Sequence, residues 1–193
     1  MHPTIYLASA SPRRHELLNQ IGIEHLVLNV PAAPGEDEPR HAHESPLQYV
    51  QRTALEKATR AQKFLSIKES AAIITADTTV ALGDQVLGKP TDALDAIRIL
   101  RVLSGKTHKV HTCVVLTWCS EQWQALSTSE VTFATINDND IAAYIQTNEP
   151  FGKAGAYGIQ GYAAKFISRL EGSYSGVMGL PLYETATLLK HLI

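Results

Sequence analysis

Apolar segments of strand character alternate along this chain with stretches that carry apolar residues at helical spacing. Strands are predicted at 5–8, 26–30, 71–75, 110–118 and 124–133, and helices at about 13–21, 46–64, 92–103, 138–147 and from Pro181 onward. Gly83-Asp84, between two short apolar segments, predicts a hairpin, and the strands at 110–118 and 124–133 are expected to pair antiparallel. These pairs exclude a purely parallel doubly wound sheet, so the sequence predicts a mixed α/β protein.

Polar residues mark the expected starts of the helices. Ser11 is expected to cap the first helix with its hydroxyl, and Ser45-Pro46-Leu47-Gln48 has the spacing of a capping box. Thr91 is expected to cap the third helix, and Asn137 opens the fourth. The inner face of the third helix is expected to carry Leu94, Ile97, Leu100 and Leu103.

Length and charge narrow the class of protein. The 193 residues predict one domain, or two tightly joined lobes, and 17 Lys and Arg against 19 Asp and Glu argue against a nucleic-acid partner. No run approaches the ~18 apolar residues that span a bilayer, and the first residues do not form a secretory signal. We therefore expect a cytoplasmic protein with no membrane partner, in which Cys113 and Cys119 are reduced core residues.

Three segments collect polar or small residues that a core does not explain. Ser9-Ala-Ser-Pro-Arg-Arg14 leads into a helix N-terminus, where arginines oppose the helix dipole unless an anion binds. Asp77 follows the predicted strand at 71–75, and the glycines of 152–161 let backbone approach a ligand closely. Each segment also has an ordinary interpretation, as solvated arginines, an Asp turn and tight glycine turns.

An ordered series of motifs carries a resemblance to a known family. The motifs are Ser9-Ala-Ser-Pro-Arg-Arg14, Glu38, Glu44-Ser-Pro, Glu56-Lys57-Ala58, Ala76-Asp77-Thr78, Gly88-Lys89-Pro90, Lys153-Ala-Gly-Ala-Tyr-Gly-Ile-Gln-Gly161 and Gly179-Leu-Pro181. In this order they resemble the Maf-type nucleoside triphosphate pyrophosphatases over essentially the whole chain. The resemblance implies a single domain, residues 1–193, with a long bent mixed sheet between two α/β lobes and a central cleft, similar to the inosine triphosphate pyrophosphatases.

The resemblance also implies an activity and its residues. Proteins of this family hydrolyse a nucleoside triphosphate to the monophosphate and pyrophosphate with a divalent metal, which we expect to be Mg²⁺ or Mn²⁺. On that pattern the catalytic residues are Asp77, Glu38, Lys57 and Lys89, of which Glu38 and Asp77 also hold the metal. The substrate would contact Ser9, Arg13, Arg14, Thr78, Lys153 and Gln160. Asp77 can act as proton acceptor or as metal ligand alone, and the sequence leaves both open.

Two further features concern the nucleotide. Thr78 and the segment 153–161 resemble the branch of the family that acts on dTTP and UTP, and the amide of Gln160 can match the adjoining carbonyl and N–H of a pyrimidine. The chain departs from the pattern at Gly152, where many relatives have Asp, and at Thr53, where Leu is usual. Neither departure removes a proposed catalytic group.

The leading hypothesis is a metal-dependent pyrophosphatase for dTTP and UTP, or for modified pyrimidine triphosphates. The alternative is a nucleotide-binding regulator of septum formation and cell division without turnover, since the family is also associated with that process. The presence of Asp77, Lys89 and Arg14 favours the enzyme. Because family members commonly dimerise, a homodimer is a further expectation.

Overall fold

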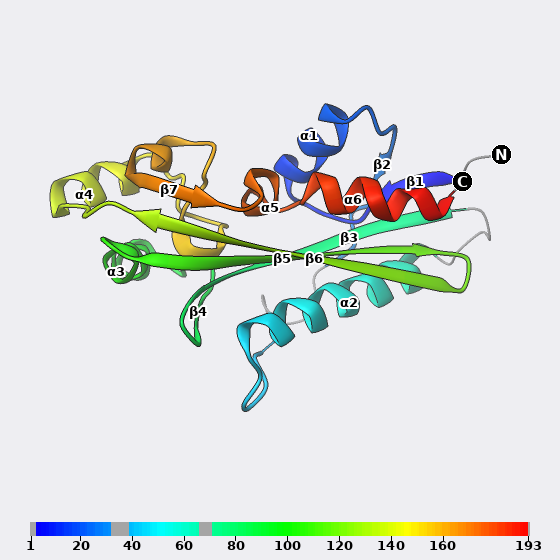
Figure 1. The fold of residues 1–193 in the computed structure, drawn as a ribbon, viewed down its shortest axis with the longest axis horizontal. Helices are drawn as coiled ribbons and strands as arrows, with labels where there is room; N and C mark the ends of the chain where they lie inside the picture. Colours follow the sequence, from blue (N-terminus) through cyan, green and yellow to red (C-terminus); the bar gives the residue numbers. More distant parts are fainter. Residues whose placement is uncertain (1–2, 32–38, 66–70, 193) are drawn as a thin grey trace.

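The computed structural model describes residues 3–31, 39–65 and 71–192, and the strands of this part form one mixed sheet (Figure 1). They are β1 (Thr4–Leu7), β2 (Leu26–Val27), β3 (Ala71–Leu82), β4 (Gln85–Leu87), β5 (Thr107–Trp118), β6 (Glu121–Phe133) and β7 (Ile167–Glu171). The order is β2-β1-β3-β5-β6-β7, with β4 paired to β3. β1 runs parallel to β2 and β3, and the other pairs are antiparallel. The predicted mixed sheet and both predicted antiparallel pairs are confirmed.

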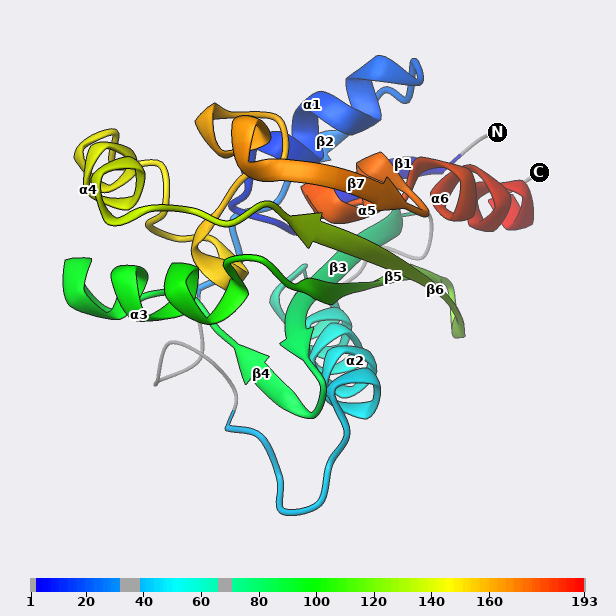
Figure 2. The same cartoon turned by 60° about the vertical axis from the view of Figure 1, so that its left-hand side comes forward.

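Helices cover both faces of this sheet. They are α1 (Pro12–Gln20), α2 (Pro46–Leu65), α3 (Ala93–Leu103), α4 (Asp138–Gln146), α5 (Tyr174–Met178) and α6 (Leu182–Leu189), with 3-10 turns η1 (Ala154–Ala156), η2 (Tyr162–Phe166) and η3 (Lys190–Leu192). α2 lies on one face, and α1, α5 and α6 lie on the other (Figure 1, Figure 2). Among the described residues, no helix is long and apolar enough to cross a membrane.

Two large apolar cores flank the middle of β3 and β5. One lies against α1 and α6 and includes Ile74 of β3 and Leu116 of β5. The other lies around α3 and α4 and includes Val80 of β3 and Val110 of β5. The stretch of β3 between the two cores carries polar residues, among them Asp77, so a polar cavity can open there. The organisation as one domain with a cleft between two lobes stays a prediction.

β3 is longer than the strand predicted at 71–75 and continues through the polar residues that follow it. Asp77 and Thr79 pair in register with Cys113 and His111 of β5. Because this ladder bonds the backbone, and because β-branched threonines suit a pleated strand, the polar stretch stays extended. The prediction that Asp77 lies in a loop after a strand at 71–75 is therefore wrong.

Two expected helix caps are confirmed. The N–H of Ser45 donates to Gln48 Oε1 at 2.9 Å and the N–H of Gln48 donates to Ser45 Oγ at 3.2 Å, which is the reciprocal capping box. Asn137 Oδ1 accepts the N–H of Asp140 at 2.8 Å and caps α4.

Two other expected caps differ in the structure. Ser11 occupies the cap position of α1, but its hydroxyl makes no capping bond, and its N–H donates to Ser9 Oγ at 3.2 Å. Asp92 rather than Thr91 caps α3, because the Asp92 carboxylate accepts the N–H of Asp95 at 2.8 Å. Thr91 and Asp92 are adjacent residues that can each cap a helix, and in the structure the Asp92 carboxylate occupies the cap position.

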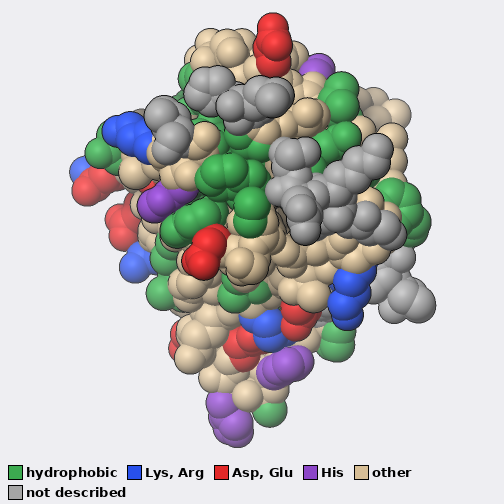
Figure 3. All heavy atoms as spheres, turned by 90° about the vertical axis from the view of Figure 1, so that its right-hand side faces the viewer, with side chains coloured by type: hydrophobic (Ala, Val, Ile, Leu, Met, Phe, Trp, Pro, Cys, Tyr) green, Lys and Arg blue, Asp and Glu red, His purple; other side chains and the backbone are tan. Residues whose placement is uncertain are grey.

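Burial also departs from expectation at two residues. Leu94 is 77% exposed, because the buried face of α3 lies on the opposite side of the helix. That face is formed by Ala96, Ile99, Leu100 and Leu103. Cys113 is a buried core residue as predicted, whereas Cys119 is exposed beyond the end of β5. On the part of the surface that Figure 3 shows, Lys and Arg side chains lie apart rather than in one broad patch.

Candidate active site

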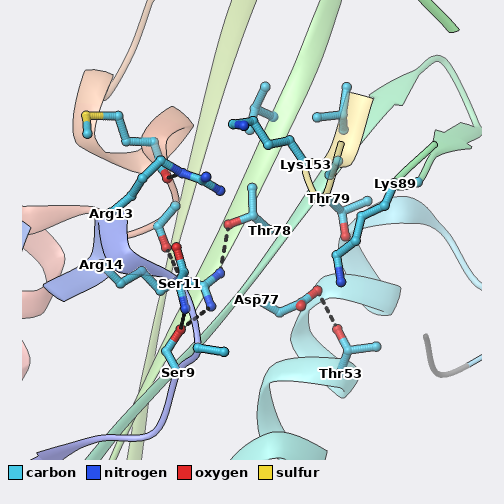
Figure 4. A pocket seen from close by; sticks show the side chains of 18 of the residues that line it. Ser9, Ser11, Arg13, Arg14, Thr53, Asp77, Thr78, Thr79, Lys89 and Lys153 are labelled. Atoms are coloured by element: carbon cyan, nitrogen blue, oxygen red, sulfur yellow. Dashed lines mark hydrogen bonds between the residues drawn. The ribbon is translucent and has the colours of Figure 1, made fainter. Parts of the chain in front are cut away.

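The polar middle of β3 lies in the wall of a cavity of about 460 Å³. Most of the rest of the lining comes from residues 8–11 and the first turn of α1, the side of α2, the end of β4, residues of the segment 152–160 and the end of α5 (Figure 4). Nine of the ten residues predicted for the site line this cavity: Ser9, Arg13, Arg14, Lys57, Asp77, Thr78, Lys89, Lys153 and Gln160. The tenth, Glu38, lies outside the described residues.

Positive charge dominates the cavity lining. The basic side chains in the described lining are Arg13, Arg14, Lys57, Arg60, Lys89 and Lys153. They face a single carboxylate among the described lining residues, that of Asp77. Clefts lined by one sign of charge concentrate ligands of the opposite sign, so this cavity suits a polyanion. Sequence reasoning missed Arg60, although its position three residues after Lys57 on a helix could have indicated it.

The two arginines of α1 are held by the chain at the end of α5. Arg13 Nε donates to the carbonyl of Met178 at 3.3 Å, and Arg14 Nε donates to the next carbonyl, that of Gly179, at 2.7 Å. Burial lowers the pKa of both guanidiniums, that of Arg14 to about 10, while the nearby Asp77 opposes the shift at Arg14. Both side chains stay positive at neutral pH. They lie at the N-terminus of α1, which adds further attraction for an anion.

A directed chain of hydroxyl hydrogen bonds fixes the terminal nitrogens of Arg14. Thr112 Oγ1 donates its one hydrogen to the Gly176 carbonyl at 2.8 Å. Thr78 Oγ1, 3.0 Å from Thr112 Oγ1, is therefore the donor in that pair, and it accepts from Arg14 Nη2 at 3.3 Å. Arg14 Nη1 donates to Ser9 Oγ at 3.2 Å. Thr78 thus holds Arg14, a role that sequence reasoning did not assign to it.

Asp77 contacts α2 through both of its carboxylate oxygens. Lys57 Nζ donates to Oδ1, and Thr53 Oγ1 donates to Oδ2 at 2.8 Å. The Asp77 side chain is 14% exposed and that of Lys57 is 35% exposed, so the pair lies at the cavity surface rather than in the core. The contact between Thr53 and Asp77 was not predicted, because it joins residues 24 positions apart.

The segment 152–161 brings Lys153 and Gln160 to the cavity. Lys153 Nζ donates to the backbone carbonyl of Glu149 at 2.5 Å, and burial lowers the pKa of Lys153, with the nearby Arg13 acting in the same direction. Gln160 is exposed at the wall. In Figure 4, Lys153 and Lys89 enter the cavity from elements other than those that carry Arg13 and Arg14.

A glycine allows this segment to approach β3. Gly155 has φ +70°, and a Cβ there would lie 2.9 Å from both γ-carbons of Val80. Its N–H donates to the carbonyl of Gly88 at 3.1 Å, which joins the segment to the end of β4. The dense glycines thus serve close packing of η1 against β3 at this position.

The sheet and its helices have the fold of a HAM1 protein. The structure of a HAM1 protein from Coxiella burnetii matches with a TM-score of 0.54 over 98% of this chain and 99% of that chain, at 16% sequence identity. The family described as Maf-like protein matches residues 4–192 of this chain. The chain therefore belongs to the Maf family, as the ordered motifs predicted.

Two relatives in this family are similar over nearly their whole length. The dTTP/UTP pyrophosphatase of Xanthomonas euvesicatoria is 54% identical over 190 residues, which cover 96% of each chain. The dTTP/UTP pyrophosphatase of Bordetella pertussis is 51% identical over 190 residues, which cover 97% of this chain and 92% of that protein.

Proposed function

We propose that this protein is a nucleoside triphosphate pyrophosphatase that hydrolyses dTTP and UTP to the monophosphate and pyrophosphate. The observation that carries the proposal is the cavity in which six basic side chains face one described carboxylate, that of Asp77. A triphosphate matches that charge, and the activity named for the two relatives supplies the reaction and the pyrimidine bases.

Preorganised positive charge would supply most of the stabilisation of the transition state in this reaction. As water attacks the α-phosphorus, negative charge builds on the departing pyrophosphate, and fixed cations stabilise it at no cost of reorganisation. Within the described residues Arg13 uses only Nε in a hydrogen bond, so its two terminal NH₂ groups are available to phosphate oxygens. Arg14 is held by three partners and offers a fixed charge beside them. We propose that Asp77, whose carboxylate is partly exposed at the cavity surface, orients the attacking water.

Ser9 can add one directed contact to the phosphates. Its Oγ accepts from the N–H of Ser11 and from Arg14 Nη1, both at 3.2 Å. These two bonds occupy both lone pairs of the hydroxyl, so its hydrogen is left for a phosphate oxygen.

A divalent cation, Mg²⁺ or Mn²⁺, is part of the proposal. Such a hard cation is held by one or two carboxylates together with the phosphates of the substrate, and Asp77 offers a carboxylate at the cavity surface. In the described part of the chain no three His, Cys, Asp or Glu side chains gather, which fits a cation that binds together with the nucleotide. When bound, it would neutralise phosphate charge. Glu38 as a second ligand stays a prediction.

Gln160 is the proposed contact to the pyrimidine. Its exposed amide can pair with the adjoining carbonyl and N–H of thymine or uracil. Replacement of Gln160 by Leu should lower the ratio of kcat/KM for dTTP to that for GTP by roughly tenfold or more, because an unpaired polar edge would be left in the complex. An unchanged ratio would remove Gln160 from base recognition.

A panel of nucleoside triphosphates with Mg²⁺ or Mn²⁺, with products separated by chromatography, tests the proposed function. We expect dTMP and UMP with pyrophosphate, and no product when the metal is chelated. Diphosphate with inorganic phosphate, or no turnover of any pyrimidine nucleotide, would contradict it. Tight binding without any product would favour the regulator of cell division instead. The homodimer and the cytoplasmic location stay predictions.

A further inference from the structure

The Asp77 carboxylate is held by two side chains that lie one turn apart on the same helix. Thr53 and Lys57 are residues i and i+4 of α2, so their side chains lie on one face. One binds Oδ2 and the other binds Oδ1. The rotation of the carboxylate therefore depends on α2 rather than on the strand that carries Asp77.

The hydroxyl hydrogen of Thr53 has three acceptors within reach and can serve one. Asp77 Oδ2 lies at 2.8 Å, the Tyr49 carbonyl at 2.9 Å and the Val50 carbonyl at 3.2 Å. Carbonyls inside a helix already accept an N–H from the following turn, whereas the carboxylate is the stronger, charged acceptor. The hydrogen therefore belongs to Asp77, and no backbone group is left unpaired by that choice.

The two partners differ in how firmly they hold the carboxylate. Lys57 carries a flexible four-carbon stem and is 35% exposed, so its ammonium can follow the carboxylate as it rotates. Thr53 is 2% exposed and β-branched in a helix, so its hydroxyl has few positions to adopt. Thr53 is thus the fixed point of the arrangement, and Lys57 is the mobile one.

We propose that Thr53 is a positioning residue for Asp77. The Thr53 hydroxyl fixes the Asp77 carboxylate in the orientation that leaves the free lone pairs of the carboxylate facing the cavity. The kinetic consequence rests on the proposed function. Thr53 itself touches neither substrate nor metal in this account and acts only through Asp77.

Three variants on α2 test this role. Thr53→Val keeps the shape and the β-branch but removes the donor, and Thr53→Ser keeps the donor. Thr59→Val is the matched control, because Thr59 also donates to a carbonyl four residues back, that of Leu55 at 3.0 Å, but lies outside the cavity lining. For Thr53→Val we expect kcat with dTTP to fall roughly 10- to 100-fold while KM changes less than about twofold. Thr53→Ser should stay within about threefold of the parent protein, and Thr59→Val should not differ from it.

Crystal structures of the Thr53 variants give a second measurement that does not depend on turnover. We expect the Asp77 carboxylate to be rotated in Thr53→Val and unmoved in Thr53→Ser. An unmoved carboxylate in Thr53→Val, or an equal loss of kcat in both variants, would overturn the proposal. If the parent protein turned over no nucleotide, the proposed function would fail, and the two structures would still decide the role of Thr53.

Discussion

At the scale of single residues, the central feature is that Asp77 lies in the middle of β3 and not in a loop. Its backbone is fixed by pairing with Cys113 of β5, and its two oxygens are bound by Thr53 and Lys57. A carboxylate held in this way has little freedom to rearrange when a substrate binds. Such fixed placement is what a group that orients water needs.

Replacement of Asp77 by Asn tests this placement. The amide replaces one of the two acceptor oxygens with an NH₂ donor, which then faces either the Thr53 hydroxyl or the Lys57 ammonium, and it removes the negative charge, so we expect turnover of dTTP to fall at least about 100-fold. The free energy of unfolding should fall by only ~1 kcal/mol, because the partly exposed Lys57 can turn to water. Asp84→Asn, in the exposed β3–β4 turn, is the matched control and should leave both quantities unchanged. Full activity of Asp77→Asn would remove Asp77 from the mechanism.

The two arginines of α1 should respond differently to replacement by Lys. Arg14→Lys loses the planar fork that binds Gly179, Ser9 and Thr78, so we expect a loss of about 1–3 kcal/mol in the free energy of unfolding. Arg13→Lys gives up one hydrogen bond to the chain and should chiefly raise KM for dTTP. Chemical denaturation and steady-state kinetics of both variants check this. Equal effects of the two changes on stability and on KM would contradict the division of roles.

At the scale of elements, the short helix α5 and the residues after it organise the opposite end of the chain, α1. The successive carbonyls of Met178 and Gly179 accept hydrogen bonds from the Nε groups of Arg13 and Arg14. The Gly176 carbonyl accepts the last bond of the chain of hydroxyl hydrogen bonds that begins at Arg14. Gly179 has φ +117°, a backbone conformation that residues with a side chain rarely adopt. A glycine is therefore required at this position for the Gly179 carbonyl to point at Arg14. The orientation of Arg14, and with it the proposed binding of the phosphates, therefore depends on a segment 165 residues away in sequence.

Gly179→Ala tests the coupling between α5 and α1. We expect a loss of roughly 1–2 kcal/mol in stability from the backbone strain, and a raised KM for dTTP because the carbonyl that holds Arg14 must move. Gly22→Ala is the matched control, since Gly22 has φ +70° with open space around it and lies outside the cavity lining. It should lose stability without a change in KM. A raised KM in both variants, or in neither, would contradict the coupling.

Local signals predicted most of the elements, and long-range contacts decided the rest. The capping box at Ser45 and the cap at Asn137 could be predicted because both partners lie within three residues. The end of β3 was misjudged, because pairing with β5 and not local composition keeps Asp77 in the strand. Among site residues, motif order named nine that line the cavity. It could not predict the contacts of Thr53, Met178 and Gly179 with the site, because these arise only when separate segments fold together.

At the scale of the whole molecule, the core around α3 and α4 contains a buried imidazole that links stability to pH. His108 Nε2 lies 2.8 Å from the Tyr157 hydroxyl, and Nδ1 has no hydrogen-bond partner among the described atoms. Burial lowers the pKa of His108 to about 4. The folded state therefore holds this ring neutral, while in the unfolded chain it takes up a proton near pH 6.5.

The free energy of unfolding should consequently fall as the pH drops from 6.5 toward 4. Between those values the unfolded chain binds more protons than the folded one, which makes a contribution from His108 of about 2 kcal/mol between pH 7 and pH 5. Urea denaturation of the parent protein and of His108→Gln at both pH values measures it. The variant should lose less stability on acidification than the parent protein. Equal losses would show that another group is responsible.

The most direct test of the proposed reaction is the position of solvent oxygen in the products. Hydrolysis of dTTP in ¹⁸O-labelled water, followed by mass spectrometry, reports which phosphorus the water attacks. We expect one ¹⁸O atom in dTMP and none in pyrophosphate, because in the proposed reaction water attacks the α-phosphorus and the basic side chains of the cavity stabilise the departing pyrophosphate. Label in pyrophosphate or in inorganic phosphate would contradict it.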